Sequence, residues 1–230
     1  MSILRVLIPL AVVVACTGIA AAVAAPAATD PPPVASLECQ VGDSWTFQYT
    51  TKDSYAGPGL NGSETFTRTA CGDRETLRPT GAVVKPSVVS DAAGNIYSTY
   101  SDFTGVAEKF GTPIPEFRLP LTPGKTWESG YDVDMGSGRG FNGTGHWTIV
   151  GWESVTVPAG TFLCVRKELK LEFSFLRPSI NGKGGEVNMT GHREITTWYA
   201  PAARADVKSL AVDSFGGTAS HELTALSLNK

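Results

Sequence analysis

Apolar and polar residues alternate along most of the chain beyond residue 38. Trp45, Phe47 and Tyr49 are separated by threonine and glutamine, and a longer run of the same kind covers residues 168–175. A period of two puts successive side chains on opposite faces of a strand, which is typical of an antiparallel sheet with one buried and one solvated face. The pattern predicts strands at 45–51, 63–70, 83–90, 95–103, 126–134, 145–157, 161–176, 186–199, 206–213 and 221–228.

Helical periodicity is weak throughout the sequence. No amphipathic helical period lasts beyond two turns, and we expect one helical turn, at 106–110, before Pro113 and Pro115 end it. The 25 glycines and 15 prolines fall between short apolar runs, and they predict hairpin turns at 91–95 and 181–185. The expected fold class is all-β: a curved antiparallel sheet that forms a sandwich or a partly closed barrel.

The first 35 residues indicate export. Arg5 precedes an uncharged run that ends only at Asp30, and small residues at 22–24 give an exit of the A-x-A type. These are the parts of a secretory signal, so we expect residues 1–24 to be a cleaved signal peptide and the protein to be periplasmic or extracellular. Residues 25–37, rich in proline and alanine, form the expected tether, and residues 38–230 suffice for a single all-β domain.

Two other interpretations of the leader stay open. Residues 13–16 resemble the lipobox of bacterial lipoproteins, in which Cys16 is acylated and attaches the protein to a membrane. An uncleaved anchor is the third interpretation, since about 20 apolar residues span a bilayer. Cys16 leaves with the signal in the first interpretation and carries the lipid in the second.

Three cysteines lie beyond the leader, and an exported protein occupies a compartment where disulfides persist. Cys39 precedes the expected strand 45–51, and Cys71 follows the expected strand 63–70. Folding this hairpin brings its outer ends together, so we expect a Cys39–Cys71 disulfide, with two free thiols as the alternative. Cys164 stands in an apolar run and is expected to be a reduced core residue.

Four short blocks of sequence carry a resemblance to a family. They are V-G-D-S-W-T-F at 41–47, L-T-P-G-K-T-W at 121–127, V-T-V-P-A-G-T-F at 155–162 and W-Y-A-P at 198–201. In this order they resemble a broad group of uncharacterised bacterial envelope proteins, over about residues 38–228. That group is similar in shape to periplasmic lipoprotein carriers, so the resemblance implies a curved antiparallel sheet around an apolar hollow, and no chemistry. Turn formation alone also explains the residue types in these blocks.

Motifs that would carry chemistry are weak. Residues 138–143 match G-x-G-x-x-G, but a strand is expected after them where dinucleotide binding requires a helix. Asp132 and Asp134 stand beside a Gly-rich loop, yet Gly136 supplies no side-chain oxygen for calcium. The histidines lie far apart, in different expected strands: His146, His192 and His221. The sequence therefore supports no catalytic residue, cofactor or metal site, and its net charge of −3 argues against nucleic acid.

The candidate binding surface is the apolar face of two neighbouring strands. We expect it to comprise Leu169, Leu171, Phe173, Phe175, Val187, Met189 and Ile195. A large exposed apolar patch is unusual on a soluble protein, so this face needs cover. The cover is either the opposite part of the same sheet, which makes a filled core, or the Pro-rich segment 111–123, which roofs a pocket for an acyl chain.

Three functions are compatible with this pattern. The first is an exported, non-catalytic envelope protein whose curved sheet binds a lipid, another apolar ligand or a partner protein. The second is a secreted hydrolase or carbohydrate-binding domain that stacks sugars on Trp147, Trp152 and Trp198. The third is a structural component of an envelope assembly with no ligand. An enclosed apolar hollow favours the first, and carboxylates clustered in a tryptophan-lined groove favour the second.

Overall fold

The computed structural model describes residues 31–53, 60–80, 88–100, 107–136, 139–178 and 185–230. The expected signal peptide, the alternative lipidation site at Cys16 and residues 181–184 of the expected turn at 181–185 lie outside these residues. In the part of the chain that the structure describes, no helix has the length and apolarity needed to cross a membrane.

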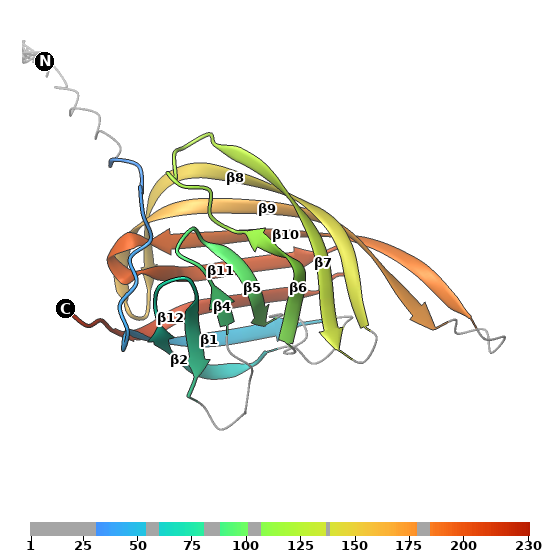
Figure 1. Cartoon of the computed structure of the whole chain (residues 1–230), viewed down its shortest axis with the longest axis horizontal. Coiled ribbons are helices and arrows are strands. Elements are labelled where there is room, and N and C mark those ends of the chain that lie inside the picture. Colours follow the sequence, from blue (N-terminus) through green and yellow to red (C-terminus); the bar gives the residue numbers. More distant parts are fainter. Residues whose placement is uncertain (1–30, 54–59, 81–87, 101–106, 137–138, 179–184) are drawn as a thin grey trace, which may run out of the picture. The chain divides into compact units, whose positions relative to one another are not determined.

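Twelve strands make up the described fold (Figure 1). They are β1 (Ser44–Lys52), β2 (Gly62–Ala70), β3 (Glu75–Pro79), β4 (Val88–Ser90), β5 (Asn95–Tyr100), β6 (Ala107–Pro115), β7 (Thr126–Gly136), β8 (Arg139–Val157), β9 (Gly160–Pro178), β10 (Glu186–Ala200), β11 (Ala205–Asp213) and β12 (Thr218–Ser227). A single turn of 3-10 helix, η1 (Pro201–Ala203), joins β10 to β11. The all-β prediction is confirmed.

The sheet closes completely into an antiparallel barrel. Each strand pairs with the next one along the chain, and β1 pairs with β12 from Ser44 opposite Ser227 to Lys52 opposite Thr218. Closure leaves no free edge to the sheet, which an open sandwich would have had to protect.

Two elements differ from the expectation. Residues 107–110 belong to strand β6 and not to a helical turn, because they pair with β5 and β7. Strand β3 was not predicted at all, because the buried Glu75 stands on its inner face and breaks the apolar alternation. Both cases show strand pairing overriding a local pattern.

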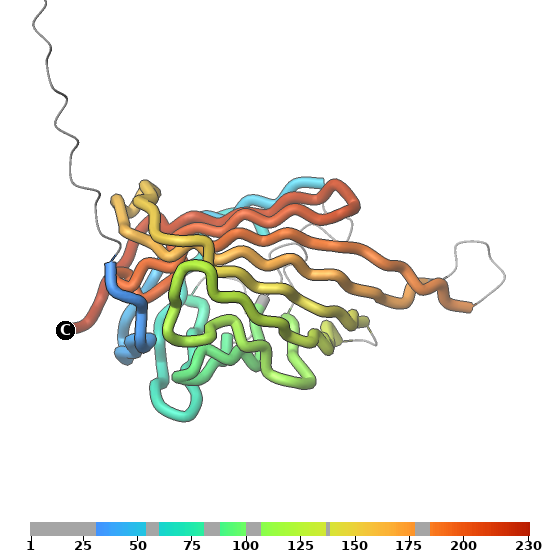
Figure 2. Tube along the Cα trace, turned by 90° about the horizontal axis from the view of Figure 1, so that it is seen from above, coloured from blue at the N-terminus to red at the C-terminus, as the bar shows by residue number. Residues whose placement is uncertain are grey.

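Consecutive antiparallel strands place their connections alternately at two ends of the barrel. We call the cap end the one that holds η1, the C-terminal residues, the N-terminal segment 31–43 and the connection 116–125 between β6 and β7 (Figure 1). The mouth end is the opposite one, at which β7, β9 and β11 finish. Figure 2 shows β9 and β10 extending past their neighbours at the mouth end.

The four sequence blocks all lie at the cap end. Asp43 is fully buried there, where its carboxylate accepts hydrogen bonds from the Asn229 backbone N–H (2.8 Å) and the Arg204 guanidinium (3.0 Å). Trp45 donates its indole N–H to the Ala203 carbonyl oxygen at 2.7 Å. Arg204 itself takes the left-handed backbone conformation that ends η1, with φ of 54°. These contacts tie both ends of the described chain to η1.

The cysteines pair as predicted. Cys39 and Cys71 form a disulfide with their Cα atoms 5.9 Å apart, across the outer ends of the β1–β2 hairpin. Cys164 is free and fully buried. Burial raises the pKa of its thiol to about 12, so at neutral pH it is an unreactive core group.

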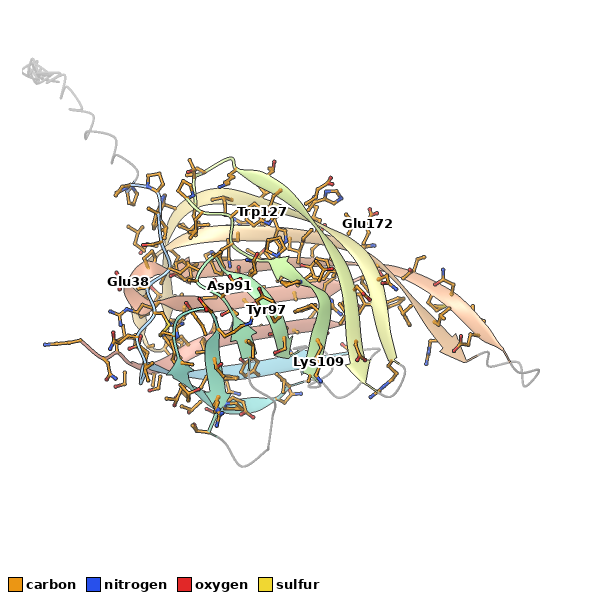
Figure 3. All side chains as sticks on the ribbon, in the orientation of Figure 1. Glu38, Asp91, Tyr97, Lys109, Trp127 and Glu172 are labelled. Atoms are coloured by element: carbon orange, nitrogen blue, oxygen red, sulfur yellow. A yellow bond between two sulfur atoms is a disulfide. The ribbon has the colours of Figure 1, made fainter. Side chains whose placement is uncertain are left out.

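The hairpin turn predicted at 91–95 joins β4 to β5. The Asp91 carboxylate accepts hydrogen bonds from the backbone N–H groups of Ala93 (3.0 Å) and Asn95 (2.9 Å) and from the Tyr97 hydroxyl (3.1 Å). Figure 3 labels Asp91 and Tyr97 at this corner. The bonds outweigh partial burial, which acts in the opposite direction, and lower the pKa of Asp91.

Candidate functional site

The barrel surrounds a partly open cavity of about 380 Å³, within the range of small-molecule sites. Side chains from all twelve described strands line it. Leu169 and Leu171 of β9 and Ile195 of β10 form one wall, and Phe47, Phe66 and Phe110 contribute from elsewhere around the barrel. The lumen is therefore a largely apolar hollow that is not completely filled.

Three of the seven predicted binding residues line this cavity directly. Leu169 and Leu171 are 3% and 2% exposed, and Ile195 stands opposite Leu169 on the neighbouring strand. Their side chains face inward together with that of Trp147 on β8, which pairs with Leu169 on the other side. This wall is the part of the predicted surface that the barrel brings to the lumen.

The other four predicted residues lie nearer the mouth end. Phe173 and Phe175 stack with ring centroids 6.1 Å apart, and Phe215 from the β11–β12 turn packs against both, at 6.4 and 6.1 Å. Met189 pairs with Phe175 and is half-buried. Val187 is 47% exposed, because it stands where β9 and β10 extend beyond the barrel.

Three inward-facing glycines make room for these side chains. A Cβ atom at Gly145 would come within 2.8 Å of Leu169, and one at Gly143 within 3.1 Å of Leu171. At Gly191 it would come within 2.9 Å of both Phe173 and Phe215. Glycine at these positions lets large side chains lie flat across the wall.

A buried ion cluster stands in the same lumen, toward the cap end. Lys167 of β9 is fully buried, and its ammonium donates to Glu116 Oε1 at 2.8 Å and to Asp206 Oδ2 at 3.2 Å. The ammonium also lies 3.6 Å from the centroid of the Phe117 ring. Two carboxylates thus share one cation in a water-poor place, and Glu116, Phe117 and Asp206 all line the cavity.

The pKa values of Asp206 and Lys167 are both raised, by the combined effects of burial and neighbouring charges. Burial raises the pKa of Asp206 to about 6, against the attraction of Lys167 and with a further contribution from Glu116. Burial lowers the pKa of Lys167, but the two carboxylates outweigh it and the net shift is upward. Lys167 therefore stays charged, and Asp206 loses its proton near neutral pH.

Other charged groups also face inward. Arg68 lies over the Trp45 ring, 5.0 Å from its centroid, and 3.9 Å from the Glu75 carboxylate. Burial raises the pKa of Glu75, although Arg68 acts in the opposite direction. Reasoning from the sequence missed this polar part of the lumen. The sequence did contain a signal for it. Every second residue of β9 faces inward, and counting back from Leu171 and Leu169 by two residues gives Lys167.

The connection 116–125, which we call the cap segment, covers the cap end of the lumen. Leu121 in this segment is fully buried and forms an isolated antiparallel β-bridge with Val34. Phe117 packs on Tyr199, with ring centroids 5.2 Å apart. Lys125 donates to the carbonyl oxygens of Leu119 (3.0 Å) and Pro120 (3.2 Å). The expected roof 111–123 is thus divided between strand β6 and this segment.

The tryptophans named for carbohydrate stacking occupy other surroundings. Trp147 is buried, stacked on Trp127 with ring centroids 5.7 Å apart, and donates to the Ser129 hydroxyl at 3.0 Å. Trp127 donates to the Pro115 carbonyl oxygen at 2.7 Å (Figure 3). Trp152 and Trp198 are half-buried, and the Trp198 indole N–H contacts the Glu153 carboxylate.

The histidines stay apart in the fold. His146 is exposed beside Glu128, at 3.1 Å, and His192 is exposed on β10. His221 lines the lumen against Phe47, with ring centroids 5.3 Å apart. Asp132 and Asp134 are exposed on β7. Within the described ranges, no three His, Cys, Asp or Glu side chains gather as a metal site would require.

Comparison with known proteins gives likenesses of fold and no family. No protein-family model matches the sequence, and no curated protein matches it either. The resemblance carried by the four blocks therefore stays an expectation.

Three solved structures are similar over most of this chain. A "putative lipoprotein" from Parabacteroides distasonis has 13% identity, covers 82% of this chain and 96% of its own, and gives a TM-score of 0.48. The "hypothetical lipoprotein YmcC" from Escherichia coli has 8% identity, coverages of 82% and 86%, and a TM-score of 0.40. A "putative exported protein with YmcC-like fold" from Bacteroides fragilis has 14% identity, coverages of 85% and 100%, and a TM-score of 0.37. Because all three TM-scores lie below 0.5, we draw no functional conclusion from these structures.

Proposed function

We propose that this protein is an exported, non-catalytic protein of the cell envelope whose barrel holds an apolar or amphipathic ligand in its lumen. The observation that carries the proposal is the cavity of about 380 Å³ behind the wall of Leu169, Leu171 and Ile195. A protein interior normally packs without voids larger than a water molecule, so space of this size in an apolar lumen favours a ligand over a purely structural role.

Export is supported by the leader pattern in residues 1–24 and by the Cys39–Cys71 disulfide, since disulfides persist in oxidising compartments. The arrangement of charged side chains in the lumen supports the proposed non-catalytic role. In the lumen, Lys167 is paired with Glu116 and Asp206, and Arg68 stands 3.9 Å from Glu75.

Burying an alkyl chain supplies the driving force for such binding. Each methylene group taken out of water contributes about 0.8 kcal/mol, so roughly ten of them suffice for micromolar affinity before the costs of association. The cavity has room for on the order of a dozen groups the size of a water molecule, each taking about 30 Å³.

The proposal is tested by filling the lumen from the inside. Ala211 of β11 is 5% exposed and lines the cavity, whereas Leu210 beside it is 44% exposed on the outer face. We expect Ala211→Phe to weaken binding of a fluorescent acyl probe at least tenfold, and Leu210→Phe to leave it unchanged. The measurement is a fluorescence titration, with the free energy of unfolding of each variant determined in urea.

Native mass spectrometry of the purified protein, before and after solvent extraction, provides the second measurement. We expect a bound mass that extraction removes and that Ala211→Phe lacks. A wild-type protein that binds no acyl probe, or a probe that binds Ala211→Phe as tightly as the wild type, would contradict lumenal binding.

A further inference from the structure

We propose that the ligand carries an uncharged, hydroxyl-bearing head that lies against Thr197 and Asp206 at the cap end of the lumen. The inference rests on the proposed function and specifies the ligand class: a long-chain alcohol or a related molecule with a neutral hydroxylated head. Two oxygen atoms in the lumen point to it.

The first oxygen is the hydroxyl of Thr197 on β10. This residue is 9% exposed, it lines the cavity, and its Oγ1 atom has no hydrogen-bond partner within the described part of the chain. A buried hydroxyl that makes no hydrogen bond lowers the stability of the fold by roughly 1–3 kcal/mol. A threonine at this position therefore destabilises the protein unless a bound molecule forms a hydrogen bond with its hydroxyl. Valine would fill the same space without that cost.

The second oxygen is Oδ1 of Asp206 on β11. The other oxygen of this carboxylate accepts from Lys167, while Oδ1 is buried and lacks a partner among the described residues. Asp206 also lines the cavity. A carboxylate oxygen only accepts hydrogen bonds, so its missing partner is a donor.

The strand register puts the two oxygens in adjoining rows of the same wall. Thr197 pairs with Lys167 on one side and with Ser209 on the other. In the next row toward the cap end, Tyr199 pairs with Asp206. Lys167 therefore neighbours Thr197 along the sheet and holds Asp206 through its ammonium group.

A hydroxyl head satisfies both atoms at once. It donates its proton to Asp206 Oδ1 and accepts the proton of the Thr197 hydroxyl. A ligand carboxylate would meet two carboxylates that share the single cation of Lys167, which repels it. A ligand ammonium can donate to both oxygens but leaves the Thr197 hydroxyl proton without an acceptor, stands near the buried Lys167 ammonium, and pays the large cost of moving a charge out of water. The apolar wall of Leu169 and Leu171 then takes the chain.

The test uses four ligands with one chain length: decan-1-ol, decanoate, decylammonium and decane. Each displaces the fluorescent acyl probe from the full-length mature protein at pH 8. We expect decanol to displace it at concentrations at least tenfold lower than either charged ligand.

Three variants separate the head-group contact from general packing. Thr197→Val keeps the β-branched shape and should weaken decanol binding about tenfold while leaving decane binding unchanged. Thr197→Ser keeps the hydroxyl and should retain decanol binding. Thr196→Val, one residue along β10 and opposite Glu168 on the outer row, is the matched control and should change neither.

Each contrary result has its own meaning. Decanol binding that survives Thr197→Val means that water alone pairs with the two oxygens, and the head-group inference is wrong. Tightest binding by decanoate or decylammonium also overturns it, while lumenal binding stands if Ala211→Phe still blocks the ligand. Failure of all four ligands to bind the wild type overturns the proposed function together with this inference.

Discussion

The cap end and the mouth end of the barrel are held together by different interactions. At the cap end, ion pairs and hydrogen bonds join segments far apart in sequence, as when Lys167 meets Glu116 and Asp206, or Arg204 meets Asp43. At the mouth end, the corresponding contacts are aromatic, made by Phe173, Phe175 and Phe215.

The difference separates two tasks. Buried ion pairs fix one geometry, because a charge moved away from its partner in an apolar medium is very costly. Ring contacts tolerate displacement, because dispersion attraction has no strong direction and each pair contributes little. We therefore expect the cap end to be the rigid floor of the lumen, and ligands to enter past the aromatic side chains of the mouth end.

The largest effect is expected at the floor, from Lys167→Met. Methionine fills the space of the side chain but leaves the partly buried carboxylates of Glu116 and Asp206 without their cation. Breaking a buried ion pair by removing one partner costs about 3–5 kcal/mol, so the free energy of unfolding in urea should fall by that amount at pH 8.

Lys170→Met on the same strand is the control for that measurement. Lys170 is exposed on the outer face, and its replacement should change stability by about 0.5 kcal/mol or less. Equal losses in the two variants would show that the cap end does not depend on the buried cation.

A smaller effect is expected from pH, because Asp206 has a pKa raised from 3.8 to about 6. The native state holds this proton more tightly than the unfolded state, so the contribution is full below pH 4 and is lost as pH rises through about 6. A shift of this size corresponds to about 2–3 kcal/mol, since each pKa unit is worth about 1.4 kcal/mol.

Urea unfolding between pH 4 and 8 measures this loss, and the difference between wild type and Asp206→Asn isolates it from other carboxylates, such as Glu75, whose pKa burial also raises. We expect the variant to lose less stability than the wild type over this window. Parallel curves for the two proteins would mean that Asp206 titrates as an ordinary surface carboxylate.

The smallest effect is expected at the mouth end, from Phe215→Ala. The ring is half-buried and contacts two others, so its removal should lower the free energy of unfolding by about 1–2 kcal/mol. The same variant should speed release of the acyl probe in stopped-flow measurements. A loss as large as that of Lys167→Met would remove the distinction between a rigid floor and a tolerant entrance.

The sequence predicted the strands well and the lumen only in part. The pattern of short apolar runs located β1, β2, β4, β5 and β7 through β12, most fully where inner and outer residues differ strongly in polarity. It failed at β3 and β6, where Glu75 and Glu108 are buried on the inside of the barrel. A buried charge looks like a surface residue until its surroundings are known.

The same reasoning explains what was predicted of the site. Leu169 and Leu171 were placed on one apolar face by their spacing alone, and these two side chains border the cavity. The cluster around Lys167 was not predicted, because its partners come from the cap segment and from β11, and spacing along one strand says nothing of them. Val187 lies on the same face of β10 as Ile195, which points inward. It is nevertheless exposed, because β10 extends beyond the barrel at this point.

The pairing of β1 with β12 sets an order of events in the life of the chain. Ser44 and Ser227 are neighbours in the sheet, so the barrel cannot close until strand β12 has been synthesised and is free to fold. Contacts between such distant residues form slowly, because the intervening chain must first lose its freedom. The β1–β2 hairpin and its Cys39–Cys71 disulfide involve only the first strands, and so can form before the later strands have folded. An unfinished barrel carries two unpaired edges at which other chains can pair, and the N-terminal cross-link holds the β1–β2 hairpin together until β12 pairs with the free edge of β1.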